Sequence, residues 1–257
     1  MARWGHHPFA PPGATVPDPT PADLLATLLA DDPARPRVTC YDDLPGPTAG
    51  ERIELSARVL EKWVAKAGNA LQEEWDIAPG SRVGLHVLPH WRALCWALAT
   101  WTVGATLSLD PEDDLDVLVT DTLPARDAEV VVYLTRASLA RSADATLPVG
   151  VIDEAAELAS FGDHLDPWDA AAPSDAALVA EGATLTYGDL VTAARRRWPD
   201  VPHGARVDVA PTTTLDLLLA VVAAWSGAGS VVLHVGGATD PDVRSRRAHD
   251  EGVDRSL

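Results

Sequence analysis

The chain has 257 residues, 47% of them hydrophobic, and can therefore bury a substantial core as one large α/β domain or as two packed lobes. Its 38 acidic and 20 basic residues give a net charge of -18, which argues against nucleic-acid binding because such proteins present a basic face. Two cysteines, Cys40 and Cys95, are too few for a disulfide framework, and we expect a reducing, cytoplasmic location.

Residues 1–20 are rich in proline and contain no apolar segment typical of a signal peptide. This composition predicts a disordered or loosely docked arm ahead of the folded region.

An amphipathic helix is predicted next, because apolar residues recur at helical spacing and Ser56 stands where a cap is expected. The expected apolar stripe consists of Leu55, Val59, Trp63, Ala67 and Leu71. Lys62 and Lys66 are the only lysines, and their spacing of four places them on one helical face, which we interpret as solvated.

A strand-helix-strand unit follows. The apolar run from Arg82 to Leu88 is typical of a buried parallel strand and ends at Pro89. A helix is expected through Leu94, Leu98 and Trp101, with Gly104 ending it before a second strand at 105–109. The acidic run 110–116 lacks the spacing of a calcium loop and is interpreted as a solvated loop.

The same unit occurs again at an offset of 124 residues. The run GSRVGLHVLPHWRALCWALATWTVGATLSL (80–109) aligns without a gap on GARVDVAPTTTLDLLLAVVAAWSGAGSVVL (204–233), with Trp101 on Trp225. A strand at 176–179 precedes it, followed by a helix for which Thr186 and Asp189 are spaced as a capping box. Two such units predict parallel strands joined by right-handed crossovers.

The segment 217–235 is nearly free of charge and long enough to raise the question of a membrane span. Ser226, Gly227, Gly229 and Ser230 interrupt it, and the repeat predicts helix, turn and strand instead. We therefore expect no membrane association. A short helix is predicted around 242–250 in the polar tail.

These residues resemble the adenylate-forming superfamily of AMP-dependent synthetases, which includes the acyl-CoA synthetases. In that family a T-Y-x-E-L helix leads to a G-D-R-V-A strand, a long helix and G-A-V-x-x-P-L-x-P, and here PGSRVGLHVLPHWRALCWALATWTVGATLSLDP follows that course. The chain also resembles a group of short bacterial synthetase-like proteins.

The resemblance implies an α/β fold of two Rossmann-like or flavodoxin-like lobes with mainly parallel sheets flanked by helices, as in the N-terminal domain of these synthetases. With the composition, it predicts an arm at 1–20, a first lobe at 21–170, a second lobe at 171–240 and a polar tail at 241–257.

The departures from the family concern its chemistry. Its glycine-rich phosphate loop ends in P-K-G, whereas the corresponding segment here, 180–185, reads AEGATL with one glycine, no lysine and a carboxylate. Thr214 stands where the family has a histidine. The stretch after residue 235 is interpreted as a turn. We find no counterpart of the parts of the family that read adenine and that carry the C-terminal lysine. We therefore expect no catalytic residue and no cofactor, and no motif supports binding of ATP, AMP or CoA.

Candidate pocket residues are inferred from the fold, because ligands of open parallel sheets collect at the carboxyl ends of strands. These are His90, Trp91, Thr212, Thr213, Thr214 and Asp216. The alternative is structural: the threonines cap a helix and the tryptophan packs. His86 and His90 are interpreted as packing or capping residues, and no zinc or other metal-binding motif is found.

Three functions remain open. The favoured one is a non-catalytic synthetase-like protein that binds a small acyl, nucleotide or CoA-like ligand, or a protein partner. The others are an acyl-activating enzyme completed by a separate subunit, and a structural or interaction protein with no ligand site.

Overall fold

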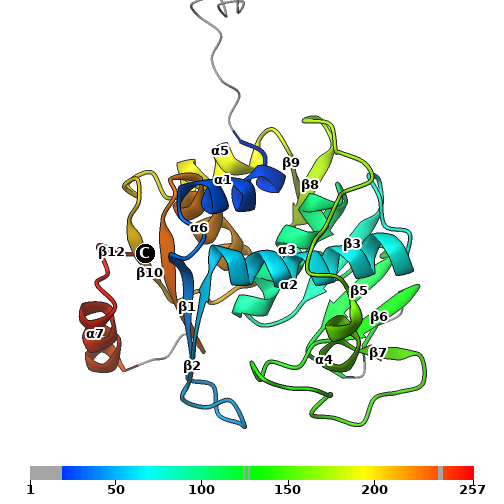
Figure 1. Ribbon diagram of the computed structural model, residues 1–257, viewed down its shortest axis with the longest axis horizontal. Helices are drawn as coiled ribbons and strands as arrows, with labels where there is room; N and C mark the ends of the chain where they lie inside the picture. Colours follow the sequence, from blue (N-terminus) through cyan, green and yellow to red (C-terminus); the bar gives the residue numbers. More distant parts are fainter. Residues whose placement is uncertain (1–18, 124, 127, 237–239) are drawn as a thin grey trace, which may run out of the picture.

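A computed structural model describes residues 19–123, 125–126, 128–236 and 240–257, and it shows two mainly parallel sheets with helices packed on them (Figure 1). The expected α/β class is confirmed. Residues 1–18, most of the expected arm, and 237–239 lie outside the described residues.

The first sheet has the order β12-β10-β11-β1-β2. Its strands are β1 (Pro36–Asp42), β2 (Glu51–Ser56), β10 (Arg206–Val209), β11 (Ser230–Val235) and β12 (Arg255–Ser256).

The second sheet has the order β7-β6-β5-β3-β4-β8-β9. Its strands are β3 (Arg82–His86), β4 (Thr106–Ser108), β5 (Val117–Thr120), β6 (Val130–Tyr133), β7 (Val151–Asp153), β8 (Ala176–Ala180) and β9 (Ala183–Thr186). The helices are α1 (Leu24–Asp31), α2 (Ala57–Asn69), α3 (Trp91–Thr102), α4 (Glu154–Glu157), α5 (Leu190–Arg197), α6 (Thr214–Ser226) and α7 (Pro241–Asp250).

The two similar sequence runs fold into two units with the same register. β3 and β4 are parallel with Arg82 opposite Thr106, and β10 and β11 are parallel with Arg206 opposite Ser230. Both members of the second pair follow those of the first by 124 residues. The predicted strand-helix-strand units are thus present, one in each sheet.

Each unit is extended by an antiparallel hairpin that comes from the other half of the chain. β1 of the β1–β2 hairpin pairs with β11, with Val38 opposite Val231, while β8 of the β8–β9 hairpin pairs with β4, with Leu178 opposite Leu107. The expected lobe boundary at residue 170 therefore does not separate the sheets. In the sequence each hairpin directly precedes one unit, whereas strand pairing places it in the sheet of the other unit.

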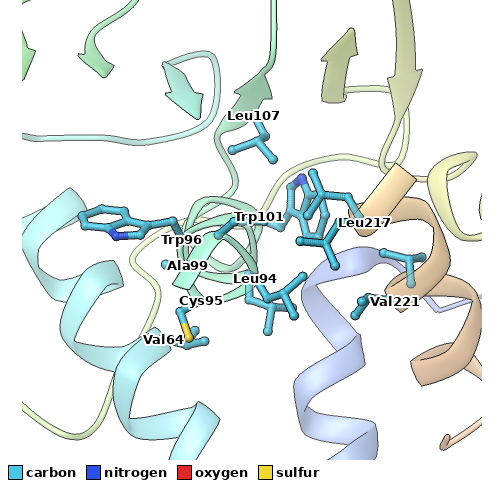
Figure 2. Packing of buried hydrophobic residues seen from close by; sticks show 14 of the residues in the cluster. Val64, Leu94, Cys95, Trp96, Ala99, Trp101, Leu107, Leu217 and Val221 are labelled. Carbon is cyan, nitrogen blue, oxygen red and sulfur yellow. The ribbon is translucent and has the colours of Figure 1, made fainter. Parts of the chain in front are cut away.

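The core is continuous across both units because α3 is buried along almost its whole length (Figure 2). Val64 of α2 lies on one side of α3, and Leu217 and Val221 of α6 lie on the other. The Trp101 indole N–H donates to the carbonyl of Ala177 at 2.9 Å and thereby ties α3 to β8. Cys95 is a buried core thiol, as the sequence indicated.

Helix α2 begins where the sequence predicts, since the Ser56 side chain accepts a hydrogen bond from the Val59 amide. Leu55 belongs to β2 and not to the helix, and Val59 is 38% exposed. The buried apolar stripe of α2 therefore differs from the expected one. The buried face of the helix and its continuation includes Ala57, Leu60, Val64, Ala67 and Leu71.

Two other local expectations need correction. Lys62 and Lys66 both form ion pairs with Asp163 at 3.0 Å. This face of α2 therefore binds the loop that contains Asp163, whereas the sequence pattern predicted a solvated face. Thr186 and Asp189 do not form a capping box, because the Thr186 hydroxyl donates to the Asp189 carboxylate and α5 begins only after Asp189.

The polar tail contains α7, close to the predicted position, and then β12, which pairs with β10 at the sheet edge. Among the described residues, no helix is both long enough and apolar enough to cross a membrane.

Candidate functional site

A cleft of about 580 Å³ lies at the carboxyl ends of strands in the second sheet. The end of β3, the segments after β4 and β5, and the β8–β9 turn form most of it, and the first turn of α6 closes it. Because α6 packs with the first sheet, the cleft lies between the two sheets. Its lining residues are Leu85, His86, Val87, Leu88, Leu109, Pro111, Asp121, Thr122, Ala180, Glu181, Thr213, Thr214 and Leu215.

Two of the six candidate residues, Thr213 and Thr214, line this cleft. The Thr213 hydroxyl caps α6 by accepting from the Asp216 amide at 3.1 Å. The Thr214 hydroxyl donates to the carbonyl of Val87 at 2.7 Å and so joins the start of α6 to the end of β3. Both threonines thus hold the cleft together as well as line it.

Thr212 and Asp216 lie in a separate hollow of about 130 Å³, together with Pro211 and Leu257. The Asp216 carboxylate accepts from the Thr213 hydroxyl at 3.1 Å. These two candidates therefore do not line the cleft, although Asp216 contacts Thr213, which does.

His90 and Trp91 are buried at 2% and 0% exposure and line none of the described cavities. His90 caps α3, with its Nδ1 accepting from the Arg92 amide at 3.4 Å, and burial lowers its pKa to about 3. The Trp91 ring packs edge-on against Trp63 at 5.5 Å between ring centroids. For this pair the structural interpretation holds, because the start of α3 is packed.

The segment 180–185 forms a tight hairpin turn. Ala180 pairs with Ala183, and Glu181 and Gly182 between them have φ values of 53° and 72°. Two consecutive residues with positive φ are typical of the two-residue turn that fits the twist of a hairpin. Strand pairing up to Ala180 and Ala183 closes this segment into a hairpin, so it is not an open anion-binding loop.

The cleft lining is acidic. Asp121 and Glu181 contribute carboxylates, whereas none of the described residues that line the cleft is a lysine or arginine. Arg126 lies nearby, but its guanidinium donates to the carbonyls of Pro111 and Asp113. The cleft thus combines an apolar floor with negative charge at its rim.

His86 and Glu181 line the cleft, although the sequence did not predict either as a pocket residue. Burial, and next the positive charge of Arg126, lower the pKa of His86, so its imidazole is neutral near pH 7. Its Nε2 is buried and has no hydrogen-bond partner in the described part of the chain. The feature of the sequence that could have identified His86 is its position, because it is the last residue of its strand.

The described residues contain no group of three or more histidine, cysteine, aspartate or glutamate side chains able to hold a metal ion. In the acidic run 110–116, Asp113 accepts from Ser108 at 2.7 Å and pairs with Arg82 at 3.3 Å. That carboxylate therefore fastens its loop to β3 and β4.

The sequence matches no family model. It is 32% identical over 263 residues to a protein of Mycobacterium tuberculosis (strain ATCC 25618 / H37Rv) described as a TIGR03089 family protein, and the match covers 95% of this chain and 100% of that one. The chain belongs to the TIGR03089 family.

Solved structures similar to this family member include several synthetases. They include an acyl-CoA synthetase of Brucella canis (TM-score 0.72, 17% identity) and an acetoacetyl-CoA synthetase of Streptomyces lividans (TM-score 0.70, 17% identity). A third is the amide bond synthetase McbA of Marinactinospora thermotolerans (TM-score 0.62, 17% identity). The matches cover 95%, 92% and 92% of this chain but only 48%, 42% and 48% of those proteins. The chain therefore shares the fold of part of these synthetases and spans about half of their length.

Proposed function

We propose that this protein is a non-adenylating, synthetase-like protein that uses the cleft between its sheets to bind a small molecule. The observation that carries the proposal is the β8–β9 turn. At the position where the resemblance implies a phosphate loop, the chain makes a closed hairpin with Glu181 at its tip.

Electrostatics supports the loss of ATP binding. Holding a triphosphate requires several free backbone amides or a cation directed at the phosphates. Here the turn places the Glu181 carboxylate on the cleft lining, and the neighbouring guanidinium of Arg126 is occupied by backbone carbonyls. A nucleotide at this site would meet repulsion where a synthetase needs attraction.

The cleft itself supports retention of a binding role. Its volume of about 580 Å³ is within the range of small-molecule sites, and it combines an apolar floor with a few polar groups. The hydrogen bond from Thr214 to Val87 fixes its two walls relative to each other. As part of the same proposal we place the protein in the cytoplasm, since its two cysteines are buried free thiols.

Two measurements on the full chain test the proposal. In ATP-pyrophosphate exchange with a mixture of carboxylic acids we expect no exchange above a no-protein blank. Reproducible exchange would contradict the loss of adenylation and favour an acyl-activating enzyme. In a thermal-shift panel of ATP, AMP, CoA, acyl-adenylate analogues and neutral or cationic small molecules, a cleft ligand must raise the melting temperature. If no compound does so, a structural or protein-binding role is favoured instead.

A further inference from the structure

We propose that the cleft ligand is a small molecule with an apolar body and a protonated amine, bound with the amine on the acidic part of the lining that Asp121 and Glu181 form. This inference rests on the proposed function, because it assigns a chemical class to the ligand of the same cleft.

The apolar body follows from the floor of the cleft. Leu85 and Val87 are buried at its base, and Leu109 and Leu215 are partly buried at its sides. Leu88 remains 47% exposed at its edge although it is a large apolar residue. A bound hydrocarbon group would remove this apolar surface from water, which favours binding.

The amine follows from the two carboxylates. Asp121 is held in place, since Oδ2 accepts from the Leu88 amide at 3.1 Å and Oδ1 from the Thr122 hydroxyl at 3.3 Å. Each of these oxygens has a further lone pair for a ligand. Glu181 makes no hydrogen bond or ion pair within the described part of the chain, so its carboxylate is available.

The positive charges near the cleft do not outweigh the negative charge of its lining. The amino end of α6 contributes roughly half a positive charge, and the Asp216 carboxylate in its first turn offsets that charge. Two full negative charges on the lining therefore outweigh the helix end. His86 is neutral near pH 7 and offers a hydrogen bond instead of a charge.

An NMR titration of the ¹⁵N-labelled full chain tests the assignment with three probes of similar shape: 2-phenylethylamine, 2-phenylethanol and 3-phenylpropionate. We expect saturable shifts of the His86, Glu181 and Thr213 amides with the amine, weaker binding of the alcohol and none of the carboxylate. Glu181→Gln should weaken the amine at least about tenfold, whereas Glu73→Gln, which changes an exposed glutamate outside the cleft lining, should leave it unchanged. Raising the salt concentration should also weaken amine binding.

The outcomes separate the two proposals. If the carboxylate, AMP or CoA shifts the cleft amides and the amine does not, the amine assignment is overturned while a ligand-binding cleft is retained. If none of the compounds shifts these amides, both proposals fail. Equal amine affinity in the parent and Glu181→Gln proteins would also overturn the assignment, and the unchanged amide spectrum of the variant would show that its fold is intact.

Discussion

His90 is an imidazole whose burial favours its neutral form. Its ring is buried at the start of α3 with Arg92 nearby, and both burial and that positive charge lower its pKa, to about 3. In the unfolded chain the same ring titrates near 6.5. Between these two values the unfolded state binds one more proton, so stability falls as pH falls, by about 1.4 kcal/mol per pH unit.

We therefore expect the parent protein to lose about 2 kcal/mol more stability than His90→Asn between pH 7 and pH 5. Asparagine is the matched replacement because its side-chain oxygen can still cap α3 but does not titrate in this range. Urea unfolding at the two pH values gives both free energies, and subtracting one protein from the other removes the contribution of other titrating groups. Equal pH dependence in the two proteins would show that His90 is not held neutral.

Arg92 and Glu154 form an ion pair with both side chains 2% exposed, at 3.1 Å between Arg92 NH1 and Glu154 Oε1. The guanidinium also lies over the rings of Trp63 and Trp91, at 4.8 and 4.6 Å from their centroids. Arg92→Met leaves a buried carboxylate without its partner, and we expect it to cost about 3–5 kcal/mol. The double variant Arg92→Met/Glu154→Leu should recover much of this loss, which urea unfolding of the four proteins of the cycle measures. A double variant as unstable as the sum of the two single variants would contradict the coupling.

At the scale of elements, α7 is attached by charge instead of by apolar packing. None of its residues is buried, yet Arg244 pairs with Asp208 at 2.6 Å and Arg247 with Asp43 at 2.6 Å. Burial disfavours the Asp208 carboxylate, but hydrogen bonds from His234 and Arg244 outweigh it and keep its pKa low. The helix thus depends on an ionised aspartate in the sheet beneath it.

Asp208→Asn should release α7, because it removes the charge that holds Arg244. Limited trypsin digestion measures this, since Arg244, Arg246 and Arg247 become cleavable when the helix detaches. We expect cleavage in this segment to accelerate about tenfold relative to the parent, while the rest of the chain resists. Asp250→Asn, on the exposed end of the same helix, is the control. Equal cleavage rates in the Asp208→Asn and parent proteins would show that α7 is held by other contacts.

Elements with strong apolar patterns could be predicted from the sequence, and those defined by pairing alone could not. The strand at 230–235 and the cap at Ser56 are confirmed because periodicity and capping chemistry are local. β12 carries no apolar pattern, and its position depends on pairing with β10. In the cleft, Thr213 and Thr214 were predictable as strand-end residues. Glu181 was not, because its place on the lining depends on a hairpin turn that no residue pattern specified.

At the scale of the molecule, the correspondence between the two units extends beyond the repeated sequence run. The first amide of β3, that of Arg82, donates to the Asp116 carboxylate at 2.7 Å, and the first amide of β10, that of Arg206, donates to Asp254 at 2.8 Å. Each aspartate precedes the outer neighbour of its strand, β5 in one sheet and β12 in the other. β12 is thus the counterpart of β5, and α7 separates β12 in sequence from the unit formed by β10, α6 and β11.

The exchange of hairpins between the units predicts that neither half of the chain folds without the other. Fragment 1–170 supplies β1 and β2 to the first sheet, while fragment 171–257 supplies β8 and β9 to the second. Each fragment alone leaves the edge of a central strand and much of the shared core exposed to water. We expect both to lack cooperative thermal unfolding when separate, and to form a one-to-one complex with the circular dichroism spectrum of the intact chain when mixed.

Val231→Asp in the second fragment is the matched control, because Val231 is fully buried and lies between Val38 and Val207 in the sheet. It should abolish the complex, since a carboxylate at this position cannot be solvated. Size-exclusion chromatography with light scattering measures the assembly. Cooperative unfolding of fragment 171–257 by itself would contradict the prediction and would restore two independent lobes divided at residue 170.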